Sequence, residues 1–332
     1  MTLEIGLGVA SSLILFCAVV SIVVISAVLY PAVAGWLDRL APATRANFLF
    51  AWATAPVWLG SLMLLLVLSP SIAHTLGIGV DHCHDHAHHV HLCVIHTPWV
   101  AGSTIEWIVL AALAALATAW LIVELARWNT ARRTLRMLLS LSKPSKDVYA
   151  MRVVPSRRHF VFTAGTLWPH IFLSSALLEE IHPRELATVV AHERAHQRRR
   201  DGLRLFLADA LGGLHLSPVR RRILADLHLA AEQACDEAAA DQSGDRLQVA
   251  ETILRLTRLI GTAAPPTGTG EAAFTGADTA LRVEGLLQPP IPQHPAFFAS
   301  VSAVATGLLL LGLASSDWWH HGAETFLGHL LG

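Results

Sequence analysis

The stretch "VVAHERAHQRRRDGL", residues 189–203, places two histidines around a glutamate and continues into a run of arginines. Its apolar positions, together with Leu186, recur at the spacing of one helical face, which predicts a helix. His192 and His196 then lie one turn apart on the same side, so both imidazoles can reach one metal ion. Glu193 sits about 100° round the helix from His192, near enough to hold a metal-bound water.

This pattern has a second reading, a helix with two solvent-exposed histidines, because a chain with 19 histidines meets it by chance in roughly one case in twenty. A catalytic zinc site needs a third protein ligand and an open position. The stretch "PVRRRILADLHLAAEQACDEAAADQ", residues 218–242, predicts a second helix with proline in its first turn. It offers Glu232, and the chain from His196 is long enough for the second helix to return antiparallel. The alternative for Glu232 is an exposed acidic face.

The composition is typical of a membrane protein. Hydrophobic residues make up 53% of the 332 residues and charged residues 15%, whereas soluble domains carry about 25% charged residues. Four stretches are long and apolar enough to span a bilayer: 5–30, 48–69, 105–126 and 297–316. We expect the first to be a retained anchor, because nothing basic precedes it and it is too long for a signal peptide.

Lysine and arginine in the loops predict the orientation of the spans. Residues 31–47 contain Arg39 and Arg45, whereas residues 70–104 contain neither lysine nor arginine. Six basic residues follow the third span, between positions 127 and 146. The positive-inside rule therefore predicts external termini and a cytoplasmic segment 127–296 in a bacterial inner membrane.

The cytoplasmic segment is long enough to fold as a domain of its own. Residues 151–175 are rich in Val, Phe, Ile and Thr with Pro and Gly between them, which predicts a few short strands. We expect residues 170–174 to form an edge strand that pairs with an extended substrate. Helices are predicted at about 245–261 and in the stretch "ADTALRVEGLL" before the last span.

The stretch "LLEEIHPRELATVVAHERAHQRRRD", followed by "EQACDEAAAD", resembles the BlaR/MecR-type family of bacterial integral-membrane zinc metallopeptidases, which belong to the gluzincin group. The resemblance implies one catalytic zinc ion with ligands His192, His196 and Glu232, and Glu193 as the catalytic base. It also implies a cytoplasmic protease domain between the third and fourth spans, and a protein substrate such as a transcriptional repressor. Sensors of this family carry a penicillin-binding domain after the last span, whereas residues 317–332 are expected to form a short external tail, so β-lactam sensing is not supported.

The expected fold class is thus an α-helical membrane protein with four transmembrane helices and an inserted cytoplasmic α+β zinc-metallopeptidase domain. Its expected parts are a membrane region at 1–126 with an external loop at about 70–104, the peptidase domain at 127–296, a fourth transmembrane helix at 297–316 and the tail at 317–332.

Four further residues are candidates for supporting roles in the peptidase domain. Asp236 and Asp201 are expected to accept hydrogen bonds from the ligand histidines, although either also suits a helix cap or a salt bridge to arginine. A tetrahedral oxyanion needs a donor besides the metal, and His215 and Arg282 are candidates for it. Their alternative is an ordinary place at the surface or at the edge of the core.

The external loop contains the tract "DHCHDHAHHVHLCVIH", residues 81–96. A histidine-rich tract predicts a site for zinc, copper or nickel, coupled through the helices to the protease. A disulfide between the two cysteines and an unstructured polar connector are the alternatives. The candidate ligands are His82, Cys83, His84, His86, His88, His89, His91 and Cys93.

Three functions compete. The first is a regulatory membrane protease, the second an HtpX-like protease that degrades misfolded membrane proteins, and the third a metal receptor or transporter. The spans contain only Glu106 and Glu124 as ionisable groups, both near span ends, which disfavours transport. A formal net charge of −1 gives no reason to expect nucleic acid, and the cytoplasmic arginines suit contact with anionic lipid.

Overall fold

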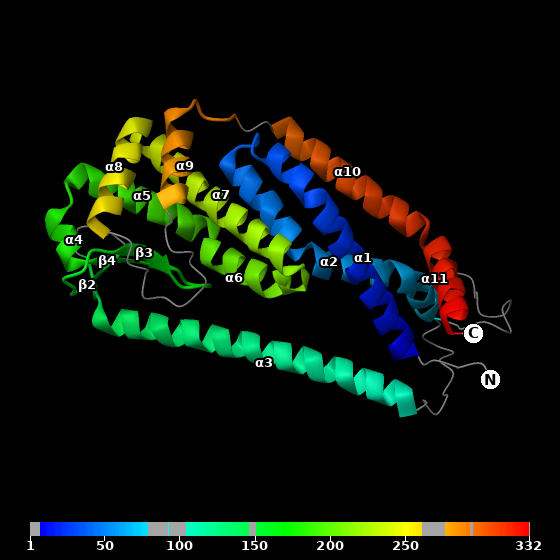
Figure 1. Cartoon of the computed structure of the whole chain (residues 1–332). Helices are drawn as coiled ribbons and strands as arrows, with labels where there is room; N and C mark the ends of the chain where they lie inside the picture. Colours follow the sequence, from blue (N-terminus) through cyan, green and yellow to red (C-terminus); the bar gives the residue numbers. More distant parts are fainter. Residues whose placement is uncertain are drawn as a thin grey trace. The chain divides into compact units, whose positions relative to one another are not determined.

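The computed structural model describes residues 7–78, 92, 104–145, 151–260, 276–292 and 295–331. Most of these residues are helical, and four short strands among them form one sheet (Figure 1). The chain divides into two compact units. The first unit comprises Met1–Ser26, Ala55–Ile122 and His294–Gly332, and the second comprises Ala27–Thr54 and Val123–Gln293.

Three long helices have the length and composition needed to cross a membrane. They are α1 (Leu7–Leu37), α2 (Pro42–Thr75) and α3 (Thr104–Leu141). Two further helices, α10 (Pro295–Ala314) and α11 (Ser316–Leu331), meet at a bend of 62° and count as a fourth span if the pair is taken as one. The described part of the chain therefore belongs to a membrane protein with three candidate spans, or four with the bent pair.

Two helices extend beyond their apolar runs. The third apolar run ends near residue 126, but α3 continues to Leu141, because arginine and leucine, which dominate the added segment, are strong helix formers. The stretch expected as a short tail forms α11, where Asp317 in the first turn complements the helix dipole. Leu327 of α11 is buried against Val67 of α2, so packing also holds this helix.

The sheet consists of β1 (Lys143–Pro144), β2 (Met151–Val154), β3 (Val161–Ala164) and β4 (His170–Ser174). Its strand order is β1-β2-β4-β3, with β4 parallel to β2 and antiparallel to β3. The prediction that residues 170–174 form an edge strand is therefore wrong. β3 folds back along one side of β4 and β2 pairs with the other, so β4 is an inner strand and β3 takes the edge.

The two faces of the sheet pack against different helices of the second unit. Ile171 and Leu173 contact Val189 and Val190 of α5 (Pro183–Arg199), which lies on one face. On the other face, Phe162 and Phe172 pack against Leu138 near the end of α3. Since side chains alternate along a strand, the two cores use alternate residues of β3 and β4.

Five helices and one turn of 3₁₀ helix complete the second unit. Besides α5, they are α4 (Ser175–Glu180), α6 (Asp201–Leu211), η1 (Gly212–Leu214), α7 (Ser217–Ser243), α8 (Arg246–Ile260) and α9 (Gly276–Leu287). His182 caps α5 in a capping box with Glu185. α5 and α7 lie side by side (Figure 1), as the sequence predicted for the two helices that carry the candidate ligands.

The second unit also contains parts of α1 and α2, which share a core with α6 and α7. Tyr30 of α1, Leu49 of α2 and Leu227 of α7 are almost completely buried in this core. The Tyr30 hydroxyl donates a 2.6 Å hydrogen bond to Asp226 Oδ2 of α7. The apolar helices thus pack directly against the helix that carries Glu232.

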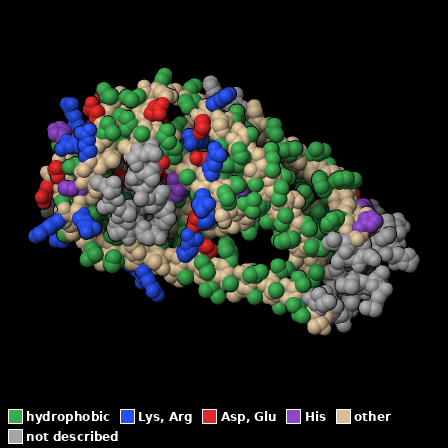
Figure 2. Space-filling view, viewed as in Figure 1, with side chains coloured by type: hydrophobic (Ala, Val, Ile, Leu, Met, Phe, Trp, Pro, Cys, Tyr) green, Lys and Arg blue, Asp and Glu red, His purple; other side chains and the backbone are tan. Residues whose placement is uncertain are grey.

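Side chains of different kinds gather on different elements. On the face shown in Figure 2, charged side chains lie over the helices and strands of the second unit, whereas α10 presents almost only hydrophobic ones. Exposed leucines at positions 308–311 agree with this view. A surface of this kind is stable where lipid, rather than water, surrounds it.

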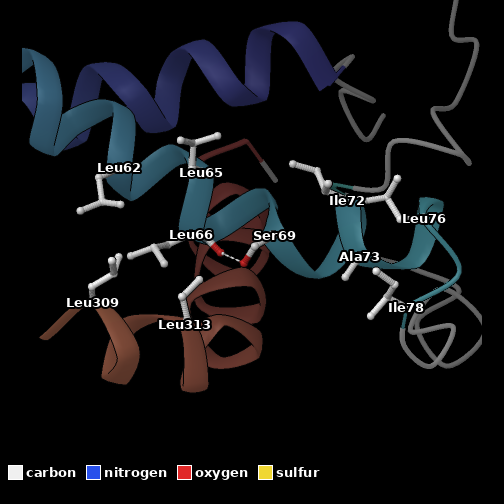
Figure 3. A pocket seen from close by; sticks show the side chains of 10 residues that line it. All are labelled: Leu62, Leu65, Leu66, Ser69, Ile72, Ala73, Leu76, Ile78, Leu309 and Leu313. Atoms are coloured by element: carbon white, nitrogen blue, oxygen red, sulfur yellow. Dashed lines mark hydrogen bonds between the residues drawn. The ribbon is translucent and has the colours of Figure 1, made fainter. Parts of the chain in front are cut away.

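The first unit contains an apolar cavity of about 420 Å³ between α2 and α10 (Figure 3). Ser69, the one polar side chain among the described residues that line it, donates its hydroxyl hydrogen to the carbonyl of Leu66 in the same helix. None of the described residues that line the cavity is titratable. Its lining residues are Leu62, Leu65, Leu66, Ser69, Ile72, Ala73, Leu76, Ile78, Leu309 and Leu313.

The histidine-rich tract at 81–96 lies outside the described residues except for Leu92. Leu92 is buried, and its N–H donates a 3.0 Å hydrogen bond to Glu324 Oε1 of α11. The predicted metal site at this tract and the alternative disulfide between Cys83 and Cys93 both remain predictions.

Candidate metal centre

α5 presents both histidines of the H-E-x-x-H pattern on one side. The His192 and His196 rings have centroids 4.9 Å apart, and their Nε2 atoms are 3.2 Å apart. Glu193, next to them in sequence, is only 7% exposed. The helix therefore aims two imidazole nitrogens at one point, as the i, i+4 spacing predicts.

Glu232 of α7 approaches the same point from the neighbouring helix. Its Oε1 lies 3.3 Å from His196 Nε2, and its Oε2 lies 3.5 Å from His192 Nε2. Ala239 and Ala240 of α7 share a buried core with Ala191 of α5, and these small side chains let the two helices lie close together. The structure thus brings together the three side chains that the sequence singled out as a ligand set.

The spacing of these donors fits a zinc ion. Zinc binds nitrogen at about 2.0–2.1 Å in a tetrahedron, so its ligand atoms lie about 3.3–3.4 Å from one another. The three separations here, 3.2, 3.3 and 3.5 Å, agree with that geometry.

Each candidate ligand histidine is oriented by a carboxylate on its other ring nitrogen. His192 Nδ1 lies 2.9 Å from Asp236 Oδ1, and His196 Nδ1 lies 2.9 Å from Asp201 Oδ2. A proton shared at Nδ1 leaves Nε2 with its lone pair toward the metal. The structure therefore places Asp236 and Asp201 where the sequence analysis expected acceptors.

The comparison with known families agrees with this geometry. The family model described as BlaR1 peptidase M56 matches residues 65–286, about two thirds of the chain. The chain belongs to the BlaR1 peptidase family. No curated protein and no solved structure matches it. The matched segment of this BlaR1-type peptidase includes α5, α6, α7 and nearly all of α9, which carry the three candidate ligands together with Asp201, Asp236 and Arg282.

Arg282, on α9 of this BlaR1-type peptidase, is the cation beside the candidate ligands. Its guanidinium is 5% exposed and donates two 2.8 Å hydrogen bonds to Asp236, from Nε and Nη2. Its Nη1 lies 2.9 Å from Glu232 Oε2. Two carboxylates of α7 thus share one buried guanidinium, which compensates part of their desolvation.

The charges of the centre shift the pKa values of its members. Burial alone would raise the pKa of Glu232, but the Arg282 guanidinium and the His196 ring hold it well below its usual range. Burial likewise opposes ionisation of Asp236, and Arg282 again lowers the pKa of that carboxyl. Both groups are therefore anionic at neutral pH and suited to a cation or a ligand histidine.

The remaining predicted residue lies elsewhere. His215 follows η1, and its Nε2 donates to the carbonyl of Trp52 in α2 at 3.2 Å. Its ring is thus held against the backbone of α2. Of the two proposed oxyanion donors, the structure brings only Arg282 beside the candidate ligands.

Two residues at the centre were not singled out from the sequence. Thr163 of β3 donates a 2.6 Å hydrogen bond from its hydroxyl to Glu193 Oε2. Cys235 is buried on α7, with its Sγ 3.6 Å from Asp201 Oδ2. Burial raises the pKa of the Cys235 thiol to about 11, so it is protonated at neutral pH. Its place between Glu232 and Asp236 in "EQACDE" is the one signal that pointed to it, whereas nothing local pointed to Thr163.

Proposed function

We propose that this chain is a membrane-anchored zinc endopeptidase that uses Glu193 as its catalytic base. The observation that carries the proposal is the triangle formed by the Nε2 atoms of His192 and His196 and the carboxylate of Glu232. Its sides of 3.2 to 3.5 Å suit one tetrahedral zinc ion with a fourth position open. Membership of the BlaR1 peptidase family supports the same reaction class.

His192, His196 and Glu232 would hold the zinc ion. When bound, zinc supplies a Lewis acid that polarises the substrate carbonyl and lowers the pKa of a water molecule toward 7. Glu193 follows His192 directly in α5, so its carboxylate would lie beside a water bound to the zinc ion. It would take a proton from this water and return it to the leaving amine as the peptide bond breaks.

The free edge of β3 is the proposed place for the substrate backbone. Ser174 donates its N–H to the carbonyl of Phe160, which makes these two residues a hydrogen-bonded pair of the antiparallel ladder. Such pairs alternate with non-bonded ones, so the N–H and C=O groups of Val161 and Thr163 point away from β4. No strand of the described ranges pairs with that edge, so an extended peptide can add there.

The predicted orientation and the family support a narrower proposal for the substrate. The arginine-rich loops support a cytoplasmic place for the second unit, and the resemblance to BlaR/MecR proteins implies cleavage of a cytoplasmic or membrane-proximal protein such as a transcriptional repressor. Mass spectrometry can distinguish a regulatory protease from a quality-control protease. It compares the proteins cleaved in cells that carry the wild type with those cleaved in cells that carry the Glu193→Gln variant. One cytoplasmic repressor supports regulation, whereas many damaged membrane proteins support quality control.

The decisive variant is Glu193→Gln, with the exposed Glu179→Gln on α4 as the matched control. In the full-length protein in detergent, we expect E193Q to lose peptide hydrolysis, by about 10²-fold or more, because the amide takes up no proton. Its zinc content should equal that of the wild type, since Glu193 is not a ligand. Wild-type hydrolysis by E193Q, or an E179Q variant impaired to the same degree, would refute the proposal.

A further inference from the structure

The edge strand and the proposed catalytic base are joined by one short hydrogen bond. Thr163 lies in β3, and its Oγ1 is 2.6 Å from Glu193 Oε2 and 3.3 Å from the carbonyl oxygen of Glu193. The single hydroxyl hydrogen points to Oε2, where the shorter distance marks a charge-assisted bond. β3 thus contacts the acidic side chain itself and not only the backbone of α5.

This bond restricts how the carboxylate can turn. A glutamate side chain rotates about three bonds, and the described ranges contain no other hydrogen bond to the carboxylate of Glu193. With Oε2 occupied by Thr163, Oε1 is the oxygen left to meet a water molecule. A base held in one rotamer reacts faster, since small errors in the position of reacting groups cost large factors in rate.

Thr163 also has a second role through its backbone. Its N–H and C=O point away from β4, to the free edge where the proposed function places the substrate. The same residue would then contact the substrate backbone with its peptide groups and the base with its side chain. A peptide that shifted along the edge of β3 would no longer have its cleaved bond aligned with the Glu193 carboxylate.

We propose that Thr163 is a positioning residue, which sets the Glu193 carboxylate in register with a peptide bound along β3. The inference rests on the proposed peptidase function. It assigns to the edge strand a share in catalysis beyond substrate binding. Val161, the other residue whose backbone groups point to this edge, has a hydrocarbon side chain and offers no hydrogen bond to the base.

The test compares three full-length variants with the wild type, all in detergent. A mixture of internally quenched fluorescent peptides serves as substrate. The kinetics are then measured on the peptide that the wild type cleaves fastest. Thr163→Val keeps the shape and the strand preference of threonine but removes the hydroxyl. Thr163→Ser keeps the hydroxyl. Thr252→Val removes a buried hydroxyl of α8 that bonds only within its own helix, and serves as the control.

We expect T163V to lower kcat at least about tenfold while KM stays within about twofold of the wild type. Zinc content should stay the same, because no ligand is changed. T163S should have a kcat within about threefold of the wild-type value, and the control T252V should have the wild-type kcat. Wild-type kcat in T163V, or T163S as impaired as T163V, would overturn the inference.

The inference can be tested even if T163V does not fold. If T163V loses zinc or melts early, Thr163→Ala replaces it, and the comparison of T163A with T163S tests the same role of the hydroxyl. The two hypotheses fail separately. An inactive wild type, or an active E193Q, refutes the peptidase itself, whereas an active wild type with an inactive E193Q and a fully active T163V refutes only the role of Thr163.

Discussion

Arg282 Nη1 lies 2.9 Å from Glu232 Oε2, while the same guanidinium donates two hydrogen bonds to Asp236. One arginine of α9 therefore fixes both the candidate third ligand and the carboxylate that orients His192. Arg282 and Asp236 have little contact with solvent, at 5% and 1% exposed, and Glu232 is partly buried. The arrangement makes α9 part of the metal centre, although it supplies no ligand.

Replacing Arg282 by methionine should destabilise the protein strongly. Removal of one partner from a buried ion pair costs about 3–5 kcal/mol, because the other charges stay buried without compensation. The control is Arg255→Met, which breaks an exposed pair with Glu185 and should cost less than about 1 kcal/mol. Denaturant unfolding of both variants measures the difference, and equal losses would contradict the role given to Arg282.

Replacing Glu232 by glutamine should weaken zinc binding while leaving the fold intact. A neutral amide is a poor ligand for zinc compared with a carboxylate, and two histidines alone make an incomplete site. Asp241→Asn changes an exposed carboxylate of the same helix and is the control. Zinc titration against a competing chelator gives the two affinities. If both variants bind zinc as the wild type does, Glu232 is not a ligand.

The pH should govern how much zinc stabilises the protein. Burial tends to lower the pKa of His192, but hydrogen bonds from its ring to Asp236 and Glu232 raise it above the usual value. A raised pKa stabilises the metal-free fold below the unfolded value, near pH 6.5, and this contribution is lost as the pH rises through the folded value. Zinc needs the neutral ring.

Both effects act in the same direction on the zinc-induced shift in melting temperature. At fixed free zinc, we expect this shift to grow between about pH 6 and pH 8, as protons leave the histidines. Differential scanning fluorimetry with and without zinc measures it across that range. A shift that is independent of pH, or that shrinks as the pH rises, would contradict histidine ligation.

Replacing Gly165 by alanine should disturb the turn between β3 and β4. Its φ is +114°, and an added Cβ would lie 2.5 Å from the carbonyl oxygen of Trp168. Gly244, with φ +71° and no atom within 4 Å of an added Cβ, is the matched control and should cost only about 1 kcal/mol. We expect a larger loss of stability and of peptide hydrolysis in G165A, with zinc retained. Equal behaviour of both variants would argue against this turn as a determinant of the edge strand.

Local sequence patterns predicted the parts of the fold that depend on local physics. The periodicity around residue 190 and the proline at 218 predicted α5 and α7, and the apolar runs predicted the long helices. The i, i+4 spacing also pointed to His192 and His196 as a ligand pair, because that geometry is fixed by the helix itself. Glu232 was reached through the second predicted helix and the resemblance to BlaR/MecR-type peptidases.

Contacts between residues far apart in the sequence could not be predicted from local patterns. The strand at 170–174 has the same alternation whether it lies inside a sheet or at its edge, so its place between β2 and β3 could not be read from its own residues. The bond from Thr163 to Glu193 joins residues 30 positions apart on different kinds of element. No periodicity links such residues, since only the fold brings them together.

α7 has one more property that follows from its contacts. Asp226, which accepts the hydrogen bond from Tyr30 of α1, precedes Glu232 by six residues, a rise of about 9 Å along one rigid helix. A rotation of α1, or its movement along its own axis, would carry Tyr30 with it and displace α7, the helix that holds the candidate zinc ligand Glu232. A movement of α1 would then reach the candidate metal centre through α7 alone, because Asp226 and Glu232 are less than two helical turns apart.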